Sequence, residues 1–334
     1  MTVRIGRRQF LAALGCAAAW PLAGRAQQRD GLRRVGVLMG GAATEAEYQS
    51  YLGAFKLGLR QLGWVEGQNL RIDVRWNDDG AELARIYAAQ LIGLMPDVIL
   101  ACSTFNLTAI QRATDTIPVV FVQVADPIAQ GFVANRREPG GNLTGFSLLE
   151  FSLGGKWVDL LKKVTPALAR AAVIFNPDFR QNRFFMQAIE AAVPSLGVEA
   201  IALPVRTAAE VEPALAGFAR TPNGGLVLLY NDVTHFEYEK IADMARRLRL
   251  PSISSGPDFA KIGGLIDYGP RNELVGQYRQ AATYVDRILK GTKPGDLPVQ
   301  AVDRYTLVIN LQTAKTLGIE VPPTLLVIAD EVIE

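Results

Sequence analysis

Cysteine and histidine are almost absent from this sequence of 334 residues, which has two cysteines and one histidine. Because zinc is held by three or four such side chains, a zinc site of the usual kind is nearly excluded. Cys16 lies in an N-terminal apolar run, so removal of that run leaves Cys102 without an intramolecular disulfide partner. The patterns G-x-S-x-G and G-x-x-x-x-G-K-[ST] are also missing, which argues against a serine hydrolase and against nucleotide binding. We expect no metal and no cofactor.

The sequence also lacks a strong excess of one charge. It has 35 basic and 33 acidic residues, and four of the basic ones lie in residues 1–26, which contain no acid. Without residues 1–26, the chain has 31 basic and 33 acidic residues. The basic residues form no stripe in the sequence, so a nucleic-acid partner is not expected. With 49% hydrophobic residues, the chain has enough apolar side chains for two folded domains. This composition favours a near-neutral protein that binds small molecules.

The first 26 residues have the pattern of an export signal. Arg4, Arg7 and Arg8 precede an apolar run over residues 10–23, and a small-residue cleavage site follows at Ala26. The run is shorter than the roughly 20 residues that a bilayer span requires. Residues 6–11 are similar to a twin-arginine export motif. We therefore predict a signal peptide over residues 1–26 and a periplasmic mature protein, with lipidation at Cys16 or a helix of the folded domain as alternatives.

Short apolar runs alternate with stretches of helical periodicity from residue 33 onward. Strands are expected near residues 35–38, 70–76, 98–101, 119–122, 172–175 and 226–229. Helices are expected near residues 48–62, 83–94, 185–196, 241–248 and 278–288, with another from about residue 107. This alternation predicts α/β architecture with parallel, doubly wound sheets.

The pattern occurs twice, which indicates two copies of one α/β unit. Landmarks that match between the halves are separated by 137, 134, 128 and 133 residues: Val35 with Ala172, Gly63 with Gly197, Val98 with Leu226, and Pro118 with Pro251. Glycine-rich segments at 139–145 and 263–269 are the expected connections between the halves. We predict two Rossmann-like lobes joined by hinge strands. The N-terminal lobe comprises residues 33–145 plus about 267–292, and the C-terminal lobe residues 146–266 plus about 293–334.

The candidate binding residues follow from this architecture, because open α/β sheets bind ligands outside the carboxyl ends of their strands. Two facing lobes would therefore place ten side chains or turns along one cleft. These are Gly40, Gly41, Ser103, Thr104, Phe105, Asp126, Asn176, Tyr230, Asp232 and Ser255.

Each polar candidate has a structural alternative. Ser103 and Thr104 precede a helix whose first amides would attract a carboxylate, but the same pair also suits an ordinary helix cap. Asp126 or Asp232 could pair with an ammonium group, or either could be a turn residue at a strand end.

The aromatic candidates also have two interpretations each. Phe105, Phe179 and Tyr230 could stack on an aromatic solute or seal the cores of the lobes. His235 is expected on a surface helix, and Cys102 in an apolar strand is expected to be a small core residue.

Several blocks resemble the ABC-transporter substrate-binding family that includes the tryptophan-binding proteins. The matching blocks are residues 118–121 with Asp126-Pro127, 139–145, 284–291, 307–311 and 329–334. The resemblance covers nearly all of residues 33–334. It implies a type I periplasmic-binding fold with three hinge crossings. It also implies that a small solute is delivered to a permease in the inner membrane, which acts with its ATPase. We expect a monomer.

The characterised branch of this family binds aromatic amino acids. Its ligand-contacting segments correspond here to Ser103-Thr104, Asp126 and Asp232. Two other functions use the same cleft: an exported hydrolase with the aspartates as acid and base, and an exported sensor domain. The single histidine and the missing nucleophile motif argue against the hydrolase.

Overall fold

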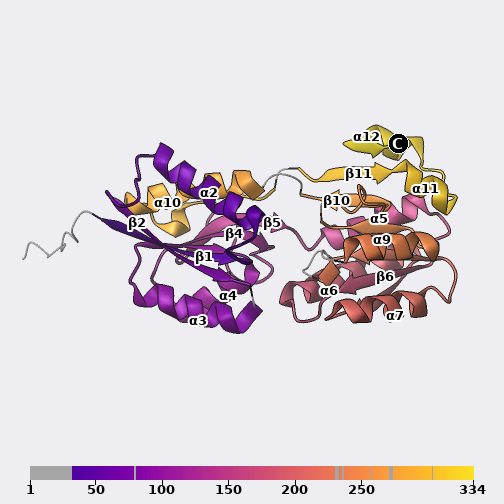
Figure 1. Ribbon diagram of the computed structural model, residues 1–334, viewed down its shortest axis with the longest axis horizontal. Helices are drawn as coiled ribbons and strands as arrows, with labels where there is room; N and C mark the ends of the chain where they lie inside the picture. The colour runs from indigo at the N-terminus through magenta and orange to yellow at the C-terminus, as the bar shows by residue number, and fades with distance from the viewer. Residues whose placement is uncertain are drawn as a thin grey trace, which may run out of the picture.

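The computed structural model describes residues 32–78, 80–229, 233–234, 237–256, 258–270, 274–302 and 304–334. Two α/β lobes lie side by side in Figure 1, each built on its own largely parallel sheet. The predicted signal peptide falls outside the described residues. Within the described ranges, no helix combines the length and hydropathy required to cross a bilayer.

The N-terminal lobe contains a five-stranded parallel sheet in the order β2-β1-β3-β4-β5. Its strands are β1 (Arg33–Gly40), β2 (Leu70–Asn77), β3 (Val98–Cys102), β4 (Val119–Ala125) and β5 (Leu143–Leu149). Its helices are α2 (Ala46–Gln61), α3 (Gly80–Gly93), α4 (Thr104–Ala113) and, much later in the chain, α10 (Leu274–Leu289), followed by a short 3-10 turn at Pro294–Asp296.

Helices cover both faces of this sheet, because its central strands are apolar on both sides. Val37 and Met39 of β1 contribute to the core under α2 and α10, which contains Phe55 and Tyr278. Leu38, between them in sequence, faces the opposite core under α3 and α4. Figure 1 shows the two helix pairs on opposite sides of the sheet.

The C-terminal lobe contains a seven-stranded sheet in the order β12-β11-β10-β9-β8-β6-β7, with only the β10–β11 pair antiparallel. Its strands are β6 (Arg170–Phe175), β7 (Glu199–Pro204), β8 (Gly224–Leu228), β9 (Ser252–Ser254), β10 (Ile266–Gly269), β11 (Thr306–Asn310) and β12 (Glu331–Ile333). Its helices are α5 (Leu153–Val164), α6 (Arg180–Leu196), α7 (Ala208–Phe218), α9 (Tyr238–Arg247), α11 (Leu311–Leu317) and α12 (Pro323–Ile328). The fully buried Trp157 of α5 lies at the centre of its larger core.

The strand order confirms the predicted repeat. The segment β7-β6-β8-β9-β10 has the same order and direction as β2-β1-β3-β4-β5, with β11 and β12 added at one edge. Val35 pairs with Val98 in the first lobe, and their predicted counterparts Ala172 and Leu226 pair with each other in the second. The predicted α/β fold with two parallel-sheet lobes is therefore confirmed.

The lobe limits differ from those expected from the glycine-rich segments. Strand β5 pairs with β4 as far as Leu149, so the chain leaves the first sheet after this residue and not near residue 145. Gly145 has φ 154°, and a Cβ atom there would lie 2.1 Å from the Phe121 carbonyl oxygen. The glycine therefore permits close strand approach and does not mark a linker.

The return crossings also differ from the expected limits of about 267 and 292. Strand β10 pairs with β9 and β11 in the C-terminal sheet. The N-terminal lobe resumes with α10 and extends to Gln300, whose N–H donates to the Gly145 carbonyl at 2.9 Å. Buried Val299 belongs to the core under α3 and α4.

Candidate functional site

The two lobes contact each other through aromatic side chains at their strand ends. Phe105, in the first turn of α4, and Phe179, which precedes α6, have ring centroids 4.9 Å apart at an interplanar angle of 68°. Figure 1 shows α4 and α6 at the boundary between the lobes. The structure therefore brings together two of the aromatic residues that the sequence offered for stacking on a solute.

Ser103 is the N-cap of α4, and its backbone is in an unusual conformation. Its φ of 86° lies in the left-handed half of conformational space, which non-glycine residues rarely adopt. Its Oγ accepts a hydrogen bond from the Asn106 N–H at 3.5 Å. Helix geometry leaves the N–H groups of Thr104 and Phe105 without intrahelical acceptors. The cap and an anion-binding role are therefore compatible at this helix N-terminus.

A buried asparagine network, which sequence reasoning missed, holds this helix start in place. Asn106 is fully buried, and its Nδ2 lies within hydrogen-bonding distance of the carbonyl oxygens of Leu38, Met39 and Cys102, at 3.2, 3.0 and 2.6 Å. Its Oδ1 accepts a hydrogen bond from Asn77 Nδ2 at 2.7 Å. The side chain therefore ties α4 to the carboxyl ends of β1, β2 and β3.

Gly40 ends β1 and Gly41 begins the turn that follows it, beside these residues. Gly41 has φ 78°, and a Cβ atom there would lie 2.1 Å from Cε2 of Tyr48. A Cβ atom on Gly40 would lie 3.8 Å from Cβ of Ser103. The N–H of Gly41 donates to the Asn77 carbonyl at 2.8 Å. The turn thus packs closely between the ends of β2 and β3.

Asp126 follows β4 and already has two backbone partners. Its Oδ1 accepts from the Ala129 N–H at 3.0 Å, and its Oδ2 accepts from the Phe151 N–H at 3.3 Å. Phe151 lies just after β5, where the chain enters the second lobe. The carboxylate therefore links the end of β4 to this crossing, while each oxygen keeps capacity for one more donor.

Two candidates from the second lobe occupy strand-end turns. Asn176 Oδ1 accepts from the Asp178 N–H at 2.9 Å, and the Asn176 carbonyl accepts from Asn182 Nδ2 at 2.9 Å. Ser255 is buried, and its N–H donates to the Leu228 carbonyl at 3.1 Å. Tyr230, Asp232 and His235 lie outside the described residues.

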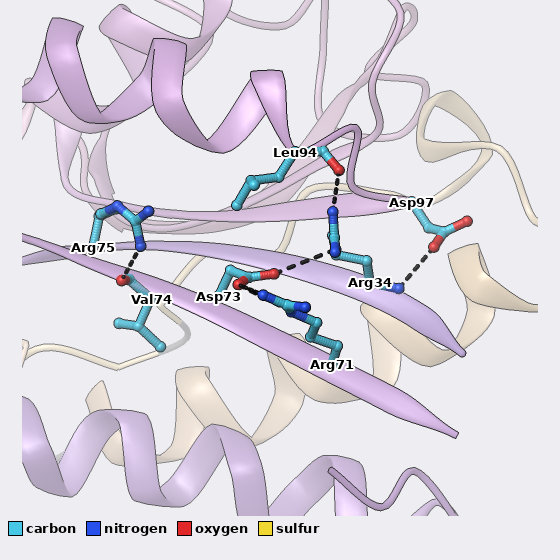
Figure 2. Close-up of polar contacts among 7 residues, drawn as sticks. All are labelled: Arg34, Arg71, Asp73, Val74, Arg75, Leu94 and Asp97. Carbon is cyan, nitrogen blue, oxygen red and sulfur yellow. Dashed lines mark hydrogen bonds and ion pairs between the residues drawn. The ribbon is translucent and has the colours of Figure 1, made fainter. Parts of the chain in front are cut away.

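The opposite end of the N-terminal sheet holds charges that pair with one another (Figure 2). Asp73 Oδ2 lies 3.4 Å from Arg34 Nε, while Asp73 Oδ1 accepts from Arg71 at 3.2 Å. The backbone N–H of Arg34 donates to Asp97 Oδ2 at 2.8 Å. An open pocket of about 580 Å³ lies beside this network and is lined in part by Arg33 and Asp97, which are also paired, at 3.0 Å. This end therefore contains a charge network that stabilises the starts of β1 and β2.

Cys102, at the end of β3, has the properties of a core residue. Complete burial raises the pKa of its thiol to about 12, and its Sγ lies 3.5 Å from Met39 Sδ. A nucleophilic cysteine requires a lowered thiol pKa, so this side chain is unsuited to covalent catalysis. Among the described residues, no cluster of three or more His, Cys, Asp or Glu side chains could hold a metal ion.

The repeated lobes and their facing strand ends define the class of two-lobed α/β binding proteins. Sequence comparison then identifies the family: a profile described as "ABC transporter substrate binding protein" matches residues 42–333. The chain belongs to this family. Such proteins typically act outside the cytoplasm, where they bind a small molecule and deliver it to an ABC permease. The predicted family and transport role are therefore confirmed.

One curated relative and two solved structures are similar to this chain. The chain is 25% identical over 269 residues to a tyrosine-binding protein of Clostridioides difficile strain R20291, which covers 80% of this chain and 76% of the relative. A conserved domain protein of Vibrio cholerae has a TM-score of 0.77 and 26% identity, over 90% of this chain and 99% of that one. The ABC domain of Streptococcus pneumoniae in complex with L-Trp has a TM-score of 0.76 and 20% identity, with the same coverage.

Proposed function

We propose that this protein is a periplasmic receptor that binds an aromatic amino acid between its lobes and releases it unaltered. The observation that carries the proposal is the contact between Phe105 and Phe179 across the lobes. It supports an aromatic lining contributed by both lobes. The names of two relatives, a tyrosine-binding protein and an L-Trp complex, are consistent with such a ligand.

The proposed binding mode divides the solute among three kinds of contact. Its carboxylate lies at the N-terminus of α4, where Thr104 and Phe105 have amides without intrahelical acceptors. Its ammonium pairs with Asp126 or Asp232, and its ring packs against the aromatic side chains. The remaining candidates form the walls: Gly40, Gly41, Ser103, Asn176, Tyr230 and Ser255. A micromolar dissociation constant corresponds to about −8 kcal/mol, which a few charge-assisted bonds and a stacked ring can supply.

Transport requires the lobes to close around the solute and then to be recognised. Closure hides the ligand and creates a surface that the permease can distinguish from the open form. We propose that the protein acts as a monomer, with no catalytic step, beside a permease driven by its ATPase. Export is proposed to remove residues 1–26. N-terminal sequencing of the periplasmic protein tests the cleavage site directly.

Calorimetry on the mature chain with L-tryptophan, L-tyrosine and L-phenylalanine tests the proposed solute class. We expect saturable binding of at least one of them, and Asp232→Ala should weaken it at least about tenfold through loss of one charged partner. NMR of the solute after prolonged incubation should show an unchanged compound. Failure to bind any aromatic amino acid would overturn the proposed ligand class, and chemical conversion would favour the hydrolase.

A further inference from the structure

Asn77, at the end of β2, has a buried side-chain oxygen that lacks a hydrogen-bond partner in the structure. The residue is only 6% exposed, and its Oδ1 is inaccessible to solvent. Buried amide oxygens are normally paired, because an unpaired acceptor loses its hydration without compensation. The unpaired Oδ1 of Asn77 therefore requires an explanation, and it lies in a part of the fold where a ligand is expected.

The neighbouring network fixes which atom of Asn77 remains free. Asn106 Nδ2 lies within hydrogen-bonding distance of three backbone carbonyls, so its own Oδ1 must face Asn77 as an acceptor. Asn77 must then present Nδ2 to that oxygen, which it does at 2.7 Å. Rotating the Asn77 amide by 180° would oppose two oxygens. Its Oδ1 is consequently held in place as an unused acceptor.

The position of Asn77 connects this oxygen to the proposed site. Asn77 is in register with Gly40, and its carbonyl accepts the Gly41 N–H. Through Asn106 it is one hydrogen bond from the first turn of α4. The unused acceptor thus lies among the residues that form the N-terminal wall, next to amides that can only donate.

We infer that the site opens at Asn77 when a solute binds, and that Asn77 Oδ1 then accepts a hydrogen bond from an N–H or O–H group of the solute and contributes to specificity for solutes with such a donor. This inference rests on the proposed function. The α4 amides favour the acidic end of a solute, whereas Asn77 favours a donor: the ammonium of an amino acid or a hydroxyl on its ring. A solute that lacks this donor would leave the buried oxygen unpaired and would bind less tightly.

Two ratios of dissociation constants, measured by calorimetry, test the inference. The first compares L-phenylalanine with 3-phenylpropionate, which lacks the ammonium; the second compares L-tyrosine with L-phenylalanine, which lacks the hydroxyl. In Asn77→Leu, preference for the donor-bearing solute should fall at least about threefold in one ratio, because the acceptor is gone. In Asn77→Asp the preference for the donor-bearing solute should rise at least about threefold in one ratio, because a carboxylate accepts hydrogen bonds more strongly than an amide. Both variants lose the bond to Asn106, so their difference isolates the acceptor.

Asn310→Leu provides a matched control. Asn310 is also a buried asparagine, but both ends of its amide are paired, with the Thr313 N–H and the Ala260 carbonyl, each at 2.8 Å. This variant should leave both ratios unchanged within threefold, even if it is less stable. If Asn77→Leu does not fold, Asn77→Asp decides: its new charge should raise one ratio at least about threefold.

The outcomes separate this inference from the function on which it rests. If the wild-type protein binds no aromatic amino acid, the proposed function fails, and the inference fails with it. If the wild-type protein binds but both ratios stay within threefold in the folded Asn77 variants, only the inference is overturned. Equal losses in Asn77→Leu and Asn77→Asp would also overturn it, because they would assign the effect to the lost contact with Asn106.

Discussion

Removing the aromatic contact between the lobes should shift the protein toward an open state. In Phe105→Ala, the ring that meets Phe179 at 4.9 Å is lost. Such pairs contribute about 0.5–1.5 kcal/mol beyond the area that they bury. If that contribution is made only when the lobes are together, the closed-to-open ratio of the ligand-free protein should fall by about 2- to 13-fold. Through this equilibrium, ligand affinity should fall by up to the same factor, because binding must then also drive closure.

Distances between the lobes can be measured with spin labels on cysteines introduced at residues 61 and 212. Both positions are exposed and lie on α2 and α7, one in each lobe. Phe105→Ala, Phe179→Ala and the double variant form a cycle in which the second substitution should add little once the first ring is gone. Identical ligand-free distance distributions in the wild-type protein and all three variants would refute the view that these rings hold the lobes together.

Three further predictions concern single residues. Because its pKa is about 12, the Cys102 thiol should resist iodoacetamide at pH 8.5 in the folded protein and react after unfolding in urea; rapid native labelling would contradict this. The Leu307 N–H lowers the pKa of Asp330, so the carboxylate contributes stability above its ordinary pKa and loses that contribution as pH falls. Urea titrations should therefore show that Asp330→Asn is more destabilising at pH 7 than at pH 3, and equal effects would disprove the linkage. Gly145→Ala should lower the free energy of unfolding by about 3 kcal/mol or more, because its Cβ would collide with the Phe121 carbonyl; a urea midpoint like that of the wild-type protein would argue against this close approach.

The strands β1, β3, β4, β6 and β8 were predictable because both faces of a parallel sheet are buried, whereas β7 and β10–β12 were not among the predicted strands. Strand β3, for example, is buried at every position and is a short continuous apolar run in the sequence. Such a run differs from the spaced apolar residues of the helices on either side of it. Strand β5 was not recognised, because Gly145 and the glycines before it suggested a flexible connection. Residue 145 must be glycine because the Phe121 carbonyl of β4 lies too close for a Cβ atom. This contact is made in the folded sheet, so the sequence around residue 145 does not indicate it.

The candidate site also contains one feature that the sequence predicts and one that it does not. Ser103 was predictable as a cap because hydroxyl residues before a helix have a local backbone role, and the structure shows that cap. The hydrogen bond between Asn106 and Asn77 was not predicted, because it joins residues 29 positions apart. An asparagine within a helical pattern is usually on the solvent face, and only the tertiary fold shows that this one is completely buried.

In the proposed site, the described contacts hold the start of α4 more firmly than they hold the two lobes together. This difference is suited to a protein that captures a solute and then releases it. The helix start at Ser103 is fixed by Asn106 to three neighbouring strands, so in the proposed binding mode its amides are already positioned before a solute arrives. Preorganised donors of this kind cost little to use, because no group must be ordered on binding. The contact between Phe105 and Phe179 is by contrast a single pair of rings from separate lobes, with an energy small enough to be lost during opening. In the proposed binding mode, capture therefore begins on a rigid first wall, and closure of the second wall is reversed when the solute passes to the permease.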